Sequence, residues 1–220
     1  MSINTNAASR VWASYLDVVD DVIPWLREDQ NDPSLPVRLQ IIVDMACQFV
    51  QNFLARPIAP TRFDQRFDGW TGWNGAYLEL PWYPVLEIVS VVEYWGVSGP
   101  HVLSESTPTE QVDGFQLRPT TGRVTRVFSG LVQKPWFPGS GNIEIVWVAG
   151  FNPVPADIKV ATLELCAYWW RNTQQQSATR SGTGTGPSDE YAPATQSGLW
   201  AGIPDRIVDL LEPYLHVGIG

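Results

Sequence analysis

Few side chains in this sequence could carry out acid–base or nucleophilic chemistry. It contains two histidines, His101 beside Pro100 and His216 near the C-terminus, and two cysteines, Cys47 and Cys166. A catalytic triad needs a nucleophile, a histidine base and an orienting acid, so two isolated histidines supply little material for one. Both cysteines lie in apolar helical patterns, which predicts buried free thiols. We expect no catalytic residues and a protein that is not an enzyme.

Motifs for metal and phosphate binding are also missing from the sequence. No Cys-x-x-Cys, His-Glu-x-x-His or Asp-x-Asp-x-Asp-Gly spacing occurs, which argues against zinc and calcium sites. SGTGTGPSDE at 181–190 lacks the Lys-Ser/Thr of a phosphate loop, so a flexible linker is the better interpretation. The acidic pairs Asp20–Asp21 and Asp189–Glu190 fit solvated surface or helix caps, and a hydrolase built on such a pair is a rival hypothesis. We expect no metal and no cofactor.

Tryptophan is the remaining candidate for a binding site, because the sequence has 11 of them. Trp70 and Trp73 stand in a glycine-rich turn, where exposed indole rings could stack on a sugar. Together with Trp82 and Trp136 they give the alternative of a carbohydrate-binding module. However, no cluster of Asp, Asn and Arg adjoins that turn, and tryptophan also supplies rigid area to protein interfaces. We therefore favour intersubunit contacts for Trp70 and Trp73.

The composition describes a globular, acidic chain. Its 220 residues can bury a core without disulfides. The net charge of −9, with only 14 Lys and Arg, argues against a nucleic-acid reader, which needs a basic face. The apolar runs are too short for a membrane span, and the first residues do not resemble a signal peptide. We expect a protein without a membrane partner that is made in a reducing cytoplasm.

Hydrophobic periodicity predicts an α+β fold, a helical bundle with an inserted antiparallel β-sheet. N-terminal helices are expected over 10–56, interrupted by Pro24 and capped by Asp32 before the longest of them, which ends at Arg56. A β-rich insert follows over 58–153, with strands at 77–80, 86–95, 115–118, 123–128 and 143–148. A second long helix is predicted at 156–173. It is apolar almost all round, so Trp169 and Trp170 become candidate intersubunit contacts.

The C-terminal region is expected to be a short helix that a flexible linker joins to the core. Residues 1–173 form the predicted core, 174–198 is a linker rich in Ser, Thr, Gly and Gln, and 199–220 is a helical arm. The arm either folds back on its own domain or docks on a partner. Its apolar side gives the candidate docking residues Trp200, Ile203, Ile207, Leu210, Leu211 and Tyr214.

The order of these parts resembles the head-to-tail adaptors that lie beneath the portal of tailed bacteriophages with siphovirus-type necks. The resemblance covers about residues 17–215. It depends on NFLARPI (52–58), LELPWYPVLEIVSVVEYWG (78–96) and IEIVWVAGFNPVPADIKVATLELCAYWW (143–170), and on GIPDRIVDLLEPYL (202–215). The first resembles the end of that family's opening helices, the next two its strand and final-helix segments, and the last its closing segment.

Membership in that family would imply a structural protein of the virion neck. It would assemble as a homo-oligomeric ring, a dodecamer of about twelve copies, around the DNA channel. The portal protein would lie above it and a stopper or tail-completion protein below it. Double-stranded DNA would pass through without sequence-specific binding, since a negative wall repels phosphate. A stopper role is the nearer alternative and the carbohydrate-binding module the more distant one.

Overall fold

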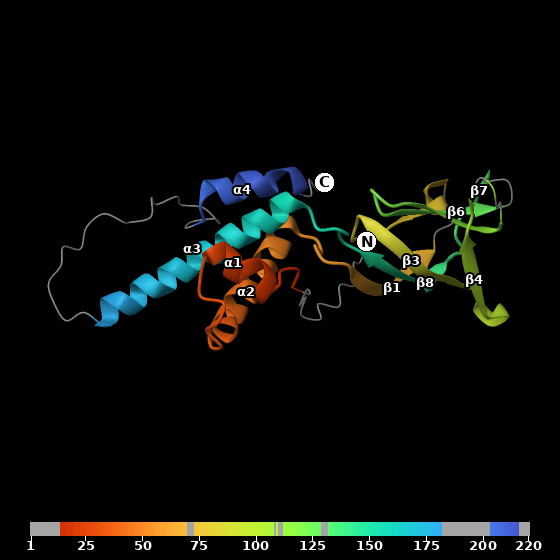
Figure 1. Cartoon of the computed structure of the whole chain (residues 1–220). Helices are drawn as coiled ribbons and strands as arrows, with labels where there is room; N and C mark the ends of the chain where they lie inside the picture. Colours follow the sequence, from red (N-terminus) through yellow and green to blue (C-terminus); the bar gives the residue numbers. More distant parts are fainter. Residues whose placement is uncertain are drawn as a thin grey trace. The chain divides into compact units, whose positions relative to one another are not determined.

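The chain folds into two compact units. The computed structural model describes residues 14–69, 73–107, 109, 112–128, 132–181 and 203–215. One unit, here called the helical unit, consists of Met1–Ala55 and Val154–Gly220, and the other, the β unit, of Arg56–Pro153 (Figure 1). The α-helices belong to the first and the sheet to the second, so the predicted α+β fold class is confirmed.

The helical unit begins with a short π-helical segment, η1 (Val18–Val22), which continues into α1 (Ile23–Leu26). The Asp17 carboxylate accepts hydrogen bonds from the backbone N–H groups of Val19 and Asp20 and so caps the segment. Pro24 occupies the first turn of α1, where its missing N–H costs no hydrogen bond. The predicted interruption at Pro24 is therefore a change of helix type. The start of the helix expected at residue 10 lies outside the described residues.

The second helix, α2 (Leu35–Leu54), is the long N-terminal helix expected from the sequence. Asp32 accepts hydrogen bonds from the backbone N–H and the hydroxyl of Ser34, which lower the pKa of its carboxyl group. The helix therefore begins after this turn, with Ser34 and not the predicted Asp32 at its N-cap and with Pro36 in its first turn. Ala55, in the left-handed conformation, ends it. One face is buried and consists of Leu35, Leu39, Val43, Ala46, Cys47, Val50, Gln51 and Leu54.

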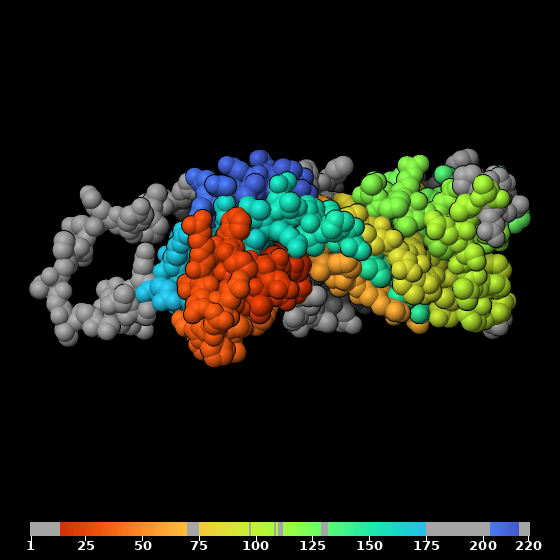
Figure 2. All heavy atoms as spheres, in the orientation of Figure 1, coloured from red at the N-terminus to blue at the C-terminus, as the bar shows by residue number. Residues whose placement is uncertain are grey.

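The third helix, α3 (Ala156–Ser181), is longer than the predicted 156–173. It includes residues 174–181 of the expected linker, and the rest of that linker lies outside the described residues. The Thr162 hydroxyl lies 2.7 Å from the hydroxyl of Tyr15 and donates to the carbonyl of Ile158. Both α2 and the short helix α4 (Asp205–Leu211) pack against α3, and η4 (Glu212–Tyr214) follows α4. Figure 2 shows α4 lying along the first turns of α3.

The β unit contains one eight-stranded sheet with the order β1-β8-β3-β4-β5-β6-β2, in which β7 also pairs with β6. The pairs are antiparallel except for the parallel pair of β4 and β5. The strands are β1 (Thr61–Gly69), β2 (Tyr77–Glu79), β3 (Val85–Tyr94), β4 (Pro100–Glu105), β5 (Gly114–Arg118), β6 (Arg123–Phe128), β7 (Val132–Gln133) and β8 (Gly139–Ala149). Five of them match predicted strands, while β1, β4 and β7 were not predicted.

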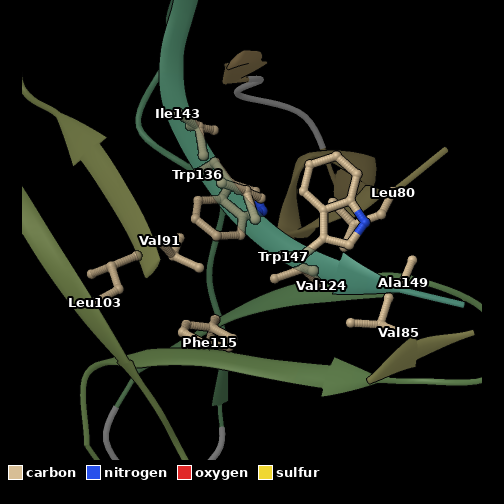
Figure 3. Packing of buried hydrophobic residues seen from close by; sticks show 11 residues of the cluster. Leu80, Val85, Val91, Leu103, Phe115, Val124, Trp136, Ile143, Trp147 and Ala149 are labelled. Atoms are coloured by element: carbon tan, nitrogen blue, oxygen red, sulfur yellow. The ribbon is translucent and has the colours of Figure 1, made fainter. Parts of the chain in front are cut away.

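Two tryptophans dominate the core of the β unit. Trp136 and Trp147 are 1% and 0% exposed, respectively, and are surrounded by aliphatic side chains of several strands (Figure 3). The indole N–H of Trp147 donates to the carbonyl of Trp82 over 3.2 Å, so this buried polar group is satisfied. Around them lie Leu80, Val85, Val91, Leu103, Phe115, Val124, Ile143, Ile145 and Ala149.

Candidate assembly surfaces

The described residues contain no group of three or more His, Cys, Asp or Glu side chains that could hold a metal ion. Over the same residues, no helix is both long and apolar enough to cross a bilayer. His101 stacks on Trp95 with ring centroids 3.7 Å apart, while His216 lies outside the described residues.

An exposed apolar stripe runs along α2. Val37, Ile41 and Met45 are 74%, 67% and 55% exposed, although each lies on a regular helix whose opposite face is buried. Their spacing of four residues places them on successive turns of one face. Exposed aliphatic groups in a contiguous row mark interaction sites more often than single exposed residues do. This spacing of four is visible in the sequence, but the stripe was not predicted, because the apolar face expected for this helix was the buried one.

The stripe ends at a groove of about 750 Å³ in the helical unit. Met45 lines it together with Phe49 and Trp169, whose rings meet edge to face at 6.1 Å between centroids. Cys47 also lines the groove, and burial raises the pKa of its thiol. The remaining lining residues are Ser14, Asp44, Gln48 and Asn52. The groove thus presents aromatic and thioether surface beside the apolar stripe.

The two tryptophans predicted on α3 have different surroundings. Trp170 is 5% exposed, its indole N–H donates to the carboxylate of Glu28 over 2.7 Å, and the guanidinium of Arg38 lies over its ring. These contacts are internal, so Trp170 is removed from the candidate intersubunit contacts. Trp169 is half-buried and faces the groove, where a second molecule could reach it.

The predicted docking arm packs on its own unit in this structure. Ile207 and Leu211 of α4 are each 1% exposed, and Arg206 forms a 3.1 Å ion pair with Glu164 of α3. The Tyr214 hydroxyl donates to Asp157 at the start of α3 over 3.3 Å. Of the two expectations for the arm, the structure therefore adopts the folded-back one.

This packing divides the candidate docking residues. Ile207 and Leu211 are used internally, which removes them from a docking surface as long as α4 stays in place. Ile203, Leu210 and Tyr214 are partly exposed. Trp200 lies outside the described residues.

The tryptophans of the proposed sugar platform do not all reach the surface. Trp136 is buried in the β-unit core, and Trp82 is half-buried with its ring 6.0 Å from that of Phe63. Trp70 and the side chain of Trp73 lie outside the described residues. Trp136 is therefore excluded as a sugar-stacking residue in the carbohydrate-binding alternative.

A buried ionic network connects β6 with β3 in the β unit. Arg126 is 0% exposed, its Nε donates to Glu93 over 3.3 Å, and its Nη1 donates to Asp113 and to the carbonyl of Gly114. Lys134 forms a second ion pair with Asp113. Partial burial of Asp113 alone would raise the pKa of its carboxyl group, but the hydrogen bonds from Lys134 and Arg126 outweigh this effect and lower it. The arrangement pairs and hydrogen-bonds the buried charges, so that loss of one partner would leave the other charge uncompensated.

No family model and no curated protein matches this sequence. Three solved chains are similar in structure over almost the whole length. One lies in the neck of an empty GTA particle computed with C6 symmetry, with a TM-score of 0.56, 15% identity, and coverage of 94% of this chain and 95% of that one. A second lies in the neck of the native GTA particle computed with C12 symmetry, with a TM-score of 0.53, 16% identity, and coverage of 93% and 94%.

The third chain belongs to the virion of the native gene transfer agent (GTA) particle, with a TM-score of 0.54, 20% identity, and coverage of 94% and 92%. At such identities the similarity concerns the fold, which includes both the helical and the β elements. The resemblance to neck adaptors seen in the sequence is confirmed at that level. The chain has the fold of the neck proteins of gene transfer agent particles.

Proposed function

We propose that this protein is a structural head-to-tail adaptor of a tailed, phage-like particle. It forms a ring under the portal, joins the DNA-filled head to the tail and lines the DNA channel in the virion neck. The observation that carries the proposal is the shared fold over more than 90% of both chains with neck proteins of GTA particles. Those necks were computed with C6 and C12 symmetry, which fits a ring of identical subunits.

The apolar stripe on α2 supplies a physical reason for such a ring. A neighbouring copy would bury the exposed side chains of Val37, Ile41 and Met45. Burial of apolar surface is the main favourable contribution to the free energy of association. Trp169 and Phe49 in the adjoining groove add aromatic area, which is enriched at interface centres. In a closed ring each copy uses two different surfaces, so this stripe would meet another part of the next subunit.

The charge of the chain agrees with a passage for DNA. A net charge of −9 per copy, repeated around a ring, gives a negative potential that disfavours adhesion of the phosphate backbone. The double helix could then move through the neck without being held. The role is accordingly structural and not catalytic.

The arm at 199–220 would contribute to docking on the portal or on a neighbour. Because Ile207 and Leu211 anchor α4 to α3, the docking surface would use the partly exposed Ile203, Leu210 and Tyr214. Two linked contacts, one through the ring and one through this surface, would raise the effective concentration of each.

Electron microscopy of the purified protein mixed with its portal tests the proposal. We expect rings of this chain on the tail-facing side of the portal and none on portal mixed with an unrelated acidic protein of similar size. A protein that stays an inert monomer beside intact portal would overturn the proposed function. A ring that binds only after another neck protein has been added would instead assign the stopper role.

A further inference from the structure

The β unit ends in a long edge strand. β1 is nine residues long, pairs only with β8, and is the last strand on its side of the sheet. One row of its backbone N–H and C=O groups therefore has no strand partner among the residues that the structure describes. Folded proteins usually protect such edges, because an open edge is a template for pairing with another chain.

The exposed side chains of β1 alternate in sign. Arg62, Asp64, Arg66 and Asp68 are all exposed and point to one face, while the residues between them are half-buried. A row of a single sign would repel a second copy of itself. A row of alternating sign attracts a second copy in one register and repels it in the neighbouring ones.

Antiparallel pairing of two β1 strands around Gln65 places a charge of opposite sign opposite each of these four residues. With Gln65 opposite the Gln65 of a second copy, Arg62 lies opposite Asp68 and Asp64 lies opposite Arg66, and the two-fold axis repeats each contact. Within the described residues, neither Arg62 nor Asp64 already makes an ion pair. These two charges are therefore available to a partner. Arg66 already pairs with Glu144 over 2.9 Å, and Asp68 accepts hydrogen bonds from the Ser140 hydroxyl and the Gly141 N–H, so each would share its charge with the second copy.

The charge row also selects the register. A slip of two residues places Arg62 opposite Arg66 and Asp64 opposite itself, which is repulsive. A slip of one residue turns the charged face of one copy toward the half-buried face of the other. The register centred on Gln65 pairs the whole strand and keeps equal faces together.

The opposite face of β1 is compatible with this pairing. Phe63 and Phe67 lie opposite each other in the same register, and both pack against Trp147, with centroid distances of 5.3 and 6.2 Å. Aromatic pairs across strands stabilise a sheet. Pairing would thus extend the apolar layer on the core face from one copy into the next.

We propose that β1 is a self-recognition edge through which two copies of this chain join their sheets in an antiparallel dimer. This contact has two-fold symmetry and closes after two copies, so it differs from the contacts between neighbours in a cyclic ring. It belongs to the free protein, and the α2 stripe plays no part in it. The proposal therefore stands or falls separately from the adaptor function.

Charge-reversal variants test the pairing with the full-length protein. Arg62→Asp with Arg66→Asp makes the row acidic, and Asp64→Arg with Asp68→Arg makes it basic. By sedimentation at low salt we expect the native chain to dimerise at roughly 100 µM, and each variant alone to have a dissociation constant at least about 30-fold higher. An equimolar mixture of the two variants should recover the dimer. Added salt should weaken the native dimer, because its ion pairs are exposed.

Cross-linking gives a second test that leaves the intramolecular contacts of Arg66 with Glu144 and of Asp68 with Gly141 unchanged. Gln65→Cys places two thiols across the two-fold axis, so a short bifunctional maleimide should link the dimer. The matched control Arg62→Cys places them about 20 Å apart and should give no link. A native chain that stays monomeric under these conditions overturns the proposal, as does a dimer that single-sign variants form unchanged or equal cross-linking of both cysteine variants.

Discussion

Arg126 and Glu93 meet inside the β unit, with Nε 3.3 Å from Oε2 and both side chains at most 2% exposed. The pair joins β6 to β3, strands that do not neighbour each other in the sheet. Glu93 also accepts a hydrogen bond from the backbone N–H of Phe137. One buried carboxylate thus fixes a β-strand and a loop at the same place.

Replacing Arg126 with methionine should destabilise the protein strongly. The change leaves Glu93 as an uncompensated buried charge, which costs about 3–5 kcal/mol in comparable cases. Urea unfolding measures this loss. The double variant Arg126→Met with Glu93→Leu should recover most of it, since an apolar pair carries no desolvation cost. Equal instability of the single and double variants would contradict this explanation.

Asp113 should make stability depend on pH in the acid range. Its folded-state pKa is lowered, so its contribution is complete above the unfolded value of about 3.9 and disappears as the pH falls through the folded value. The stability difference between the native protein and Asp113→Asn should therefore shrink below about pH 4. Urea unfolding across pH 2–7 measures it, and Asp209→Asn, at an exposed carboxylate that has no ion pair among the described residues, is the control. A difference that grows toward low pH would refute the assignment.

The helices could be predicted because their residues repeat a burial pattern locally. Helical period alone decides which residues share a face, and it predicts seven apolar residues on one stripe of α2. Five of them are buried, Leu39, Val43, Ala46, Val50 and Leu54, while Ile42 and Phe53 are half-buried. The end of α3 was missed for the opposite reason. Residues 174–181 are polar and give no apolar period, yet the helix continues through them.

The missed strands show where composition misleads. β1 alternates Arg and Asp with other residues and has a glutamine at its centre, so it lacks the β-branched run by which strands are usually found. Its alternation of Phe63, Gln65 and Phe67 with charged residues nevertheless has the period of two that marks a strand. β4 begins at Pro100, which is tolerated there because it stands at the end of the strand.

The assembly surfaces were predictable only in part. Sequence spacing cannot tell whether an apolar residue is covered by its own chain or left for a partner. Trp170 and Ile207 looked like candidates for contact and are buried, while Val37 and Ile41 are exposed. That distinction depends on how α3 and α4 pack, which is tertiary information.

Ile41→Asp should abolish ring formation and leave the fold intact. The side chain is 67% exposed, so the charge causes little loss of folded-state stability but would be buried without a partner at a subunit contact. Electron microscopy with portal should show bare portals, and circular dichroism should show an unchanged melting curve. Gln40→Glu, an exposed neighbour with the same change in charge, should still form rings. Normal rings with Ile41→Asp would remove the α2 stripe from the interface.

Ile207→Ala should destabilise the helical unit by about 2–4 kcal/mol, because it creates a cavity between α4 and α3. Leu210→Ala, on the partly exposed side of α4, should cost much less and should weaken attachment to the portal. Urea unfolding and co-sedimentation with portal separate the two effects. If Leu210→Ala bound normally while Ile207→Ala alone failed, α4 would act in folding and not in docking.

The two thiols should report on assembly through their reactivity. Burial, with a smaller effect of Cys47, raises the pKa of Cys166 to about 12, so almost no reactive thiolate exists at neutral pH. The pKa of Cys47 is also raised, but this residue lines the groove beside Phe49 and Trp169. Iodoacetamide should therefore alkylate Cys47 slowly and Cys166 more slowly still, as measured by mass spectrometry with Cys47→Ser and Cys166→Ser as references.

In portal-bound rings, Cys47 should become further protected from alkylation, while the reactivity of Cys166 should not change. Equal labelling of Cys47 in free and assembled protein would show that the neighbouring subunit leaves the groove open.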